Sequence, residues 1–380
     1  MELFWHRRDL RVADNLGLAA AAGARDDDRG PAAPVFVFDP DVLDHASDVR
    51  VRRLLDGLAS LRADYRERGS DLLVARGDPE TVLPALADAL DADRVVWNRD
   101  YSGLARERDA AVRTALNDAG VEREAHHDAV LHTPDSIRTN AGDPYSVYTY
   151  YWKKWTDRET DQPAPTPEAS DLVGADSLSA AVERVGDGAV TDGGPATEAV
   201  AVGDLPDPAA LGFSEPEAEV GPAGTEAARD RLSAFLDEAV FSYDAERDYP
   251  AKDATSRLSA FLKYGEIGVR ETYEATTEAL TAAEARAEDA ADDDDGGPVV
   301  AVEEFQQQLA WREFYTQVLY HNPEVVTANY KEYEEGIAWR DDPEEIAAWK
   351  RGETGYPIVD AGMRQLREEA FMHNRVRMIV

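Results

Sequence analysis

The first 130 residues alternate between two hydrophobic periods, and this alternation restricts the possible folds more than any other feature. Short, continuous apolar runs typical of a buried parallel sheet occur at Leu3–Trp5, Val35–Phe38, Leu72–Val74 and Val95–Trp97. Apolar residues at helix spacing separate them, and the segment 104–119 ends at Gly120, a typical helix stop. The pattern predicts an α/β domain with a doubly wound parallel sheet, Rossmann-like, and a ligand crevice at the carboxyl ends of its strands.

Composition along the chain divides it into three regions. Residues 1–130 form the predicted α/β domain, and residues 131–224 form an acidic interdomain connector that we expect to be partly disordered at 176–204. Residues 225–380 have helical patterns with Trp and Tyr concentrated between 305 and 356, so we expect an all-α second domain. The segment 282–297 contains four consecutive Asp residues and is expected to be a surface loop.

The net charge of −37 argues at first against a nucleic-acid partner, because affinity for phosphates comes from Lys and Arg. However, acids are spread over the whole chain and only six of the 40 basic residues are Lys, which is typical of proteins soluble in high salt. Any DNA site must therefore be a local basic strip. The large charge also favours a monomer.

Several classes of protein are excluded. The chain has no Cys, so it has no disulfide, no thiolate nucleophile and no Cys-bound metal. It has no apolar run long enough for a membrane span and no secretion signal at its start, so we expect a cytoplasmic protein with no membrane association. Neighbouring His126 and His127 point to opposite faces of a strand, which argues against a metal there.

A cluster of hydroxyls lies where a helix is expected to begin, at Thr255-Ser256-Arg257-Leu258-Ser259. Ordinary helix capping explains such hydroxyls about as well as ligand binding does. Three hydroxyls and a guanidinium at a helix N-terminus would, however, suit a phosphate or pyrophosphate. Tyr243 could offer the same ligand a hydroxyl or a flat face.

A second candidate site is a stripe on one helix, formed by Gln308, Trp311, Arg312 and Tyr315. Aromatic stripes at this spacing usually belong to the core. An amide, an indole and a guanidinium together could instead stack on a base and hydrogen-bond its edge.

Two short basic strips complete the candidates. Residues 371–378 place Arg375 and Arg377 beside Asn374, either as a solvated helix face or as a phosphate-binding strip with a base-reading amide. Arg7, Arg8 and Arg11 follow the first predicted strand. They either hold an anionic ligand in the crevice or form salt bridges with Asp9 and Asp14.

Taken in order, these segments resemble the DNA photolyase and cryptochrome family, and the resemblance covers nearly the whole chain except the acidic connector and loop. The residues that carry it lie in the segments 5–15, 243, 255–259, 311–315, 352–364 and 372–378. It implies an α/β domain that holds a light-harvesting antenna and a helical domain that binds reduced FAD.

The resemblance also assigns roles to residues. It implies FAD contacts by Tyr243, Thr255, Ser256, Arg257, Leu258, Ser259 and Arg377. It implies a lesion-facing and DNA-facing surface formed by Arg247, Gln308, Trp311, Arg312, Tyr315, Asn374, Arg375 and Met378. Trp339 matches the outermost tryptophan of the electron relay. The resemblance implies that Arg7, Arg8 and Arg11 line the antenna crevice, which is either empty or occupied by 8-hydroxy-5-deazaflavin or methenyltetrahydrofolate.

In the family, reduced FAD absorbs light and passes an electron to a cyclobutane pyrimidine dimer flipped out of UV-damaged DNA, after which the dimer splits and the electron returns. The absence of a nucleophile or acid–base pair agrees with this, since the cofactor carries the difficult chemistry. We therefore expect a cyclobutane dimer photolyase from a salt-adapted organism. The alternatives are a cryptochrome-type photoreceptor and a non-photochemical nucleotide-binding protein.

Two departures from the family pattern matter. Cyclobutane dimer enzymes commonly have a Glu where Gln308 stands, and an amide lacks the charge of that Glu. Enzymes for the (6-4) photoproduct have a second His near residue 374, and Asn374 therefore favours the cyclobutane dimer. The sequence also ends within an expected helix, so we expect a truncated chain. By itself this chain is expected to bind FAD weakly or not at all, which would leave it inactive.

Overall fold

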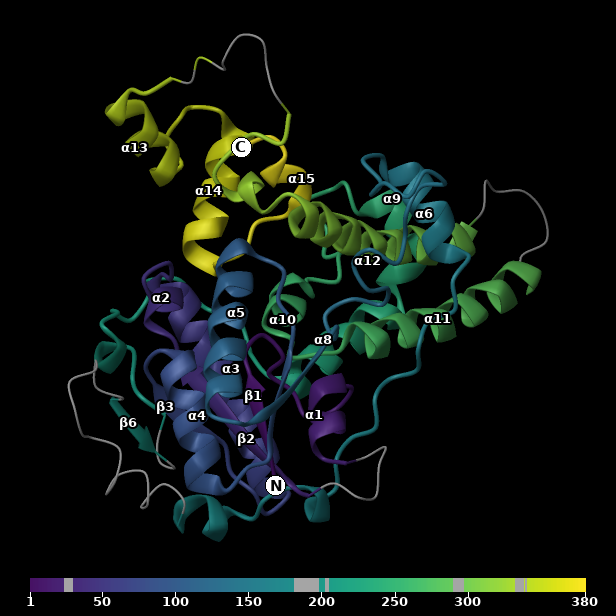
Figure 1. Cartoon of the computed structure of the whole chain (residues 1–380). Coiled ribbons are helices and arrows are strands. Elements are labelled where there is room, and N and C mark those ends of the chain that lie inside the picture. The colour runs from purple at the N-terminus through teal and green to yellow at the C-terminus, as the bar shows by residue number, and fades with distance from the viewer. Residues whose placement is uncertain (24–29, 181–197, 202–204, 290–296, 332–337, 339) are drawn as a thin grey trace.

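The computed structural model describes residues 1–23, 30–180, 198–201, 205–289, 297–331, 338 and 340–380. Its first part is the expected α/β domain, which stacks below the helical part in Figure 1. The five parallel strands are β1 (Glu2–His6), β2 (Ala32–Phe38), β3 (Leu73–Arg76), β4 (Arg94–Asn98) and β5 (Glu122–His126). They lie in the order β5-β4-β1-β2-β3, and a short strand β6 (Glu198–Ala201) pairs antiparallel with β3. The doubly wound sheet expected from the sequence is confirmed.

Helices cover both faces of this sheet because its strands β1 to β4 are apolar on both sides. On one face, Leu3, Trp5 and Val35 pack against α4 (Pro79–Leu90) and α5 (Gly103–Asp118). On the other face, Phe4 and Phe36 pack against α1 (Leu16–Ala21) and α3 (Asp48–Glu67). The short helix α2 (Pro40–Leu43) follows β2. The carboxyl ends of β1, β4 and β5 face the helical part of the chain, because the residues that follow these strands line one pocket with Lys263 and Arg312.

The helical part is built around two long helices, α11 (Val269–Asp289) and α12 (Gly297–His321). Shorter helices pack around them or follow them in the chain: α8 (Thr225–Asp237), α9 (Tyr243–Glu246), α10 (Ser259–Tyr264), α13 (Pro343–Arg351), α14 (Pro357–Glu369) and α15 (Asn374–Arg377). One apolar cluster joins α8, α9, α10, α11 and the first half of α12. A smaller cluster joins α14 and α15, which lie near the C-terminal end in Figure 1.

The segment between the two parts has more structure than the connector expected over residues 131–224. Helix α6 (Tyr148–Thr156) packs through Tyr148, Tyr151 and Trp155 against α12, and β6 extends the sheet. Residues 181–197 and 202–204 lie outside the described part. Likewise, the acidic segment at 282–297 is not wholly a loop, because α11 continues to Asp289. The boundaries of the three regions therefore stay a prediction.

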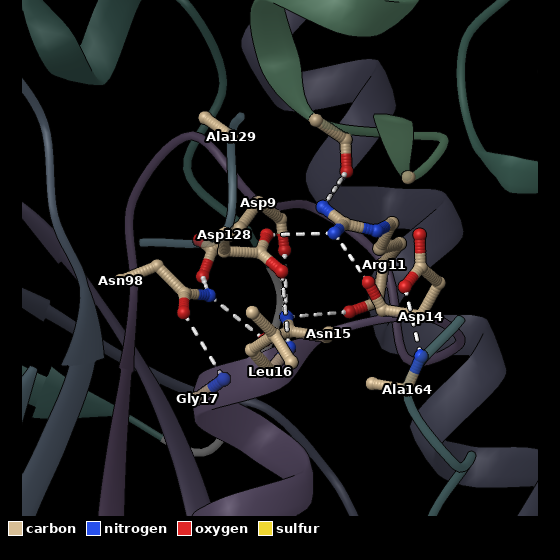
Figure 2. A network of polar contacts seen from close by, with 12 residues as sticks. Asp9, Arg11, Asp14, Asn15, Leu16, Gly17, Asn98, Asp128, Ala129 and Ala164 are labelled. Atoms are coloured by element: carbon tan, nitrogen blue, oxygen red, sulfur yellow. Dashed lines mark hydrogen bonds and ion pairs between the residues drawn. The ribbon is translucent and has the colours of Figure 1, made fainter. Parts of the chain in front are cut away.

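A buried polar network joins the two parts at the strand ends. Arg270 of α11 donates to Asp14 Oδ1 at 2.7 Å and to Asp128 Oδ1 at 2.5 Å. Arg11 donates to Asp128 Oδ2 at 2.6 Å and to the carbonyl of Gly265 at 3.1 Å. Figure 2 shows Arg11, Asp14 and Asp128 gathered between the first helix and the strand ends. All four charged side chains are buried, so each charge depends on its partners.

Gly265 is where α10 docks onto the α/β domain, and we expect its replacement by alanine to be costly. Its φ of +67° favours glycine, and a Cβ there would lie 2.1 Å from the carbonyl oxygen of Arg8. Gly265→Ala should lower the free energy of unfolding by roughly 2–3 kcal/mol, measured by chemical denaturation. The control is Gly212→Ala, which has a φ of +90° but no atom within 4 Å of the added Cβ. Equal losses in the two variants would show that the docking contact contributes nothing.

Candidate functional site

The hydroxyl cluster lies in a tight turn before α10. Arg231 of α8 holds this turn by donating to the carbonyls of Thr255 at 2.6 Å and Ser256 at 2.9 Å. Arg257 has a φ of +51°, a conformation that non-glycine residues rarely adopt and that often marks functional sites. Its guanidinium lies over the ring of Phe371, 4.6 Å from the centroid. The turn therefore lies beside the segment that leads into α15.

Of the two interpretations of these hydroxyls, the structure does not support helix capping. The N-cap of α10 is Leu258, with no side-chain cap hydrogen bond, and the helix has only six residues. Ser256 Oγ accepts only a long contact of 3.4 Å from the Leu258 amide. The reason is that Arg257 turns the chain in the left-handed conformation, which separates Thr255 and Ser256 from the first helical turn. Phosphate binding there would therefore depend on side chains more than on a helix dipole.

Tyr243 of α9 is buried beside the start of α12. Its ring contacts Phe235 and Phe305 edge-on, at centroid distances of 5.7 and 5.4 Å. The guanidinium of Arg247 lies 5.7 Å from the Tyr243 ring centroid. Burial raises the pKa of Tyr243, which keeps its hydroxyl protonated.

The aromatic stripe of α12 is only partly core. Trp311 is half-buried and stacks on Tyr148 of α6, with 3.5 Å between centroids and 11° between ring planes. It also stacks with Tyr315 at 5.5 Å, and Tyr315 is 62% exposed. Gln308 is half-buried one turn earlier. The three aromatic rings form a stack that reaches the surface.

Arg312 does not belong to this surface, which corrects its expected place on the DNA-facing stripe. It donates to the carbonyl of Ala129 at 2.6 Å and of Leu262 at 3.4 Å. The physical reason is that Arg312 follows Trp311 by about 100° around the helix and so turns toward the strand ends, where backbone acceptors are available. Burial lowers its pKa to about 10, so it stays charged.

The neighbouring Glu313 holds the exit of β5 against α12. Its carboxylate accepts hydrogen bonds from the Leu131 amide at 2.8 Å, the His132 amide at 3.0 Å and the Tyr151 hydroxyl at 3.2 Å. Burial raises the pKa of Glu313 to about 7 despite these hydrogen bonds. Glu313 is therefore a structural tie between the two parts of the chain.

The strip around α15 is largely exposed, which both interpretations of the sequence require. Asn374, Arg377 and Met378 are exposed, and Met378 Sδ lies 3.9 Å from Asn374 Nδ2. Arg375 forms a two-point ion pair with Asp248, with Nε to Oδ1 at 3.0 Å. The strip therefore has two guanidinium groups, one of which is already paired.

The turn after α9 brings the second and third candidate sites together. Arg247 pairs with Glu304 of α12 at 2.6 Å, and Gln308 donates to the same carboxylate at 3.2 Å. The next residue, Asp248, pairs with Arg375 of α15. We call Arg247, Gln308, Trp311, Tyr315 and Arg375 the candidate recognition surface.

The arginines after β1 behave differently from one another. Arg7 and Arg8 line a pocket of about 180 Å³ at the strand ends, together with Asp100, Lys263 and Arg312. Arg8 donates to both oxygens of Asp100, at 2.9 and 3.0 Å, and Arg7 pairs with Asp109 at 2.5 Å.

Arg11 does not line this pocket, which corrects its expected role in the crevice. It is buried and forms an ion pair with Asp128 in the polar network between the two parts of the chain. The expected salt-bridge partners were also wrong, because Asp9 accepts from the Arg7 amide and Asn98 while Asp14 pairs with Arg270. These partners lie up to 256 residues away in the sequence, beyond the reach of local patterns.

The sequence of this chain matches known protein families and relatives. A DNA photolyase family model matches residues 2–168, and a model of the FAD-binding domain of DNA photolyase matches residues 305–380. A deoxyribodipyrimidine photo-lyase of Halobacterium salinarum is 56% identical, over all of this chain and 74% of that protein. The chain belongs to the DNA photolyase family.

Solved photolyase structures agree with the fold. A class III photolyase from Agrobacterium tumefaciens is 32% identical, with a TM-score of 0.77 over all of this chain and 71% of that one. A cryptochrome from Synechocystis shares the fold, with a TM-score of 0.76 over 99% of this chain and 73% of that one, at 20% identity. The photolyase/cryptochrome fold expected from the sequence is therefore confirmed.

Some functional candidates of this photolyase were missed or cannot be placed. Tyr148, Glu304 and Asp248 were not identified from the sequence; the aromatic run at 145–155 and the four-residue spacing of Glu304 from Gln308 were the available signals. Trp339 lies outside the described residues. In the described part of the chain, no helix is long and apolar enough to cross a membrane, and no group of His, Asp and Glu side chains is placed to hold a metal.

Proposed function

We propose that this photolyase-family chain splits cyclobutane pyrimidine dimers in UV-damaged DNA, using light absorbed by reduced FAD. The observation that carries the proposal is the candidate recognition surface, where a surface-reaching aromatic stack lies beside an amide and arginines. The relative from Halobacterium salinarum, whose name is that of a dimer-splitting photolyase, supports the same assignment. A DNA substrate is consistent with our expectation that the protein is cytoplasmic. The expectation that it is a monomer stays a prediction.

The residues around the turn before α10 fit a dinucleotide cofactor by their chemistry. Thr255 and Ser256 are half-buried hydroxyls, Ser259 and Arg257 are exposed, and Arg231 fixes the backbone between them. Hydroxyl and guanidinium donors are suited to a pyrophosphate. We propose that these residues, with Tyr243, Leu258 and Arg377, hold FAD. When bound and reduced, FAD supplies the photoexcited electron for the lesion.

Trp311 would position the flipped-out lesion. Its indole is stacked on Tyr148 and also contacts Tyr315. Because these contacts hold the indole in place, the Trp311 side chain loses little conformational entropy when a pyrimidine stacks on it. A damaged pair is poorly stacked and paired, so extruding it costs only about a few kcal/mol. The rigid stack can therefore offset the cost of flipping. Asn374 and Met378 are exposed on the neighbouring strip and are proposed to contact the same DNA.

The arginines of the surface would bind the DNA backbone. Arg375 is held by Asp248, which competes with phosphate, whereas Arg247 pairs with Glu304 through Nη1 and can offer its other N–H groups to phosphate without leaving Glu304. Planar guanidinium groups can exchange a two-point contact with carboxylate for one with phosphate. The competing carboxylate keeps nonspecific binding weak in a chain of net charge −37.

We also propose that the strand-end pocket is the antenna site. Arg7, Arg8 and Lys263 give it a positive lining, and the charge of Arg8, together with burial, lowers the pKa of Lys263 to about 8. Such a lining suits an anionic conjugated molecule. The choice between 8-hydroxy-5-deazaflavin and methenyltetrahydrofolate stays open, and fluorescence of the purified protein from cells that make each compound would decide it.

A light-dependent repair assay tests the proposed function. The chain is loaded with FAD, reduced, mixed with a DNA oligonucleotide containing one thymine dimer, and illuminated with blue light. We expect restored thymines in the illuminated sample and none in a dark control. Bound flavin without dimer splitting would reject the repair proposal and favour a photoreceptor. FAD is supplied at saturating concentration because weak binding is expected from the sequence, and failure to bind flavin even then would reject both photochemical assignments for these 380 residues by themselves.

A further inference from the structure

The amide of Gln308 is fixed in one orientation by Glu304, one turn earlier on α12. Gln308 Nε2 donates to the Glu304 backbone carbonyl at 3.1 Å and to Glu304 Oε1 at 3.2 Å. Both amide hydrogens are therefore used within the protein. Because two acceptors face this nitrogen, the reversed orientation would place two oxygens against the amide oxygen. In the described part of the chain, no donor contacts Gln308 Oε1.

Glu304 is itself held in place. Its carboxylate pairs with Arg247 at 2.6 Å, and both side chains are only partly exposed. Burial raises the pKa of nearby Tyr148, and the charge of Glu304 raises it further, which places that charge close to the ring on which Trp311 stacks. The carboxylate of Glu304 thus accepts from both Arg247 and Gln308. These contacts fix Gln308 beside the aromatic stack.

We propose that Glu304 is a positioning residue that turns the amide oxygen of Gln308 toward the lesion. Gln308 then acts as a hydrogen-bond acceptor and selects pyrimidines that carry an imide N–H. This inference rests on the proposed function and adds to it a reason for the preference of the same site for pyrimidines with an N3–H. An amide that can rotate presents either its oxygen or its NH₂, whereas one held by Glu304 presents only oxygen. Thymine and uracil carry an N3–H donor that this oxygen can accept, and N3 of cytosine lacks that hydrogen.

Glu304 also compensates for the charge that Gln308 lacks. A carboxylate that accepts from the amide nitrogen polarises the amide, because hydrogen bonds in a chain strengthen one another. Negative charge thereby moves toward Gln308 Oε1, while Arg247 balances Glu304. The neutral amide therefore behaves as a stronger acceptor without a buried, unpaired carboxylate next to the lesion.

Binding in the dark tests this inference without light or electron transfer. The full chain is titrated with oligonucleotides containing a thymine dimer, the same dimer methylated at both N3 positions, or undamaged thymines. For the natural chain, N3-methylation should weaken binding of the dimer about tenfold, the effect of one lost hydrogen bond at a fixed acceptor. Glu304→Gln should reduce this penalty to roughly threefold, since a glutamine at 304 can accept from or donate to Gln308 and only the backbone carbonyl of residue 304 then still favours one orientation of the amide.

Two further variants separate positioning from charge and stability. Glu303→Gln removes the same charge from an exposed neighbour on α12 and should keep the tenfold penalty. The double variant Glu304→Gln, Gln308→Glu should regain it, because a carboxylate accepts in every orientation. Thermal unfolding of each variant reports any loss of folding.

The outcomes distinguish this inference from the proposed function. If the natural chain does not prefer the dimer over undamaged DNA, the proposed function fails. If it prefers the dimer but N3-methylation has no effect, or if Glu304→Gln and Glu303→Gln behave alike, only the role of Glu304 is refuted. Reduction of the penalty in Glu304→Gln and its return in the double variant would support that role.

Discussion

Replacing Trp311 by alanine is expected to weaken binding of dimer-containing DNA by about 10- to 100-fold, while the affinity for undamaged DNA stays nearly unchanged. Stacking of a base on an aromatic side chain contributes roughly 1–3 kcal/mol, and only an extruded lesion gains this contact. The stack with Tyr148, at 3.5 Å between ring centroids, holds the indole ready for it. Titration with the two oligonucleotides in the dark measures both affinities.

Trp349→Ala is the matched control for this prediction. Trp349 lies on α13, is 37% exposed and makes no ring contact within the described residues. The same change in side chain at this position should leave both affinities within about twofold of the natural chain. A similar loss in both variants, or an equal loss for damaged and undamaged DNA in Trp311→Ala, would refute the lesion-stacking role.

Replacing Arg270 by alanine is expected to lower the free energy of unfolding by about 3–5 kcal/mol. Arg270 lies between Asp14 and Asp128, with N–O distances of 2.7 and 2.5 Å, and its side chain is fully buried. Its removal leaves two buried carboxylates, of which only Asp128 keeps a strong partner in Arg11. Because the pair joins α11 to the strand ends, denaturant unfolding should show the loss across both parts of the chain.

Arg229→Ala is the control, because it removes an exposed ion pair instead of the buried ion pairs of Arg270. Arg229 pairs with Glu271, the residue next to Arg270, but about half of its side chain is exposed. Exposed pairs contribute little, so this variant should lose less than about 1 kcal/mol. If Arg270→Ala loses no more than Arg229→Ala, the buried network does not hold the two parts together.

The sequence predicted strands β1 to β4 well because they are buried on both faces and therefore appear as continuous apolar runs. The edge strand β5 is partly exposed and polar, so it has no such run. Leu3–Trp5, Val35–Phe38 and Val95–Trp97 all lie in strands of the sheet. Helix α6 was missed because its large side chains are tyrosines and tryptophans and because the acidic, proline-rich stretch that follows it, from Glu159, led the whole segment to be assigned as a connector. Strand β6 is four residues long and pairs with a distant strand, so it has no local signal.

The candidate site was predictable to the extent that helix spacing determines it. Trp311 and Tyr315 lie together on α12 as expected from their separation of four residues. Helix spacing already turns Arg312 about 100° away from Trp311, but its acceptor, the carbonyl of Ala129, comes from another part of the chain and required the three-dimensional structure. The pairs of Arg247 with Glu304 and of Arg375 with Asp248 also required the three-dimensional structure.

The most direct test of the account follows a single complex from darkness into light. The chain with reduced FAD is bound in the dark to an oligonucleotide containing one thymine dimer, in the presence of excess undamaged competitor, and is then illuminated with blue light. We predict that the labelled DNA is retained in the dark and that illumination restores its thymines and releases it. DNA that remains bound, with the dimer intact after illumination, would contradict the account.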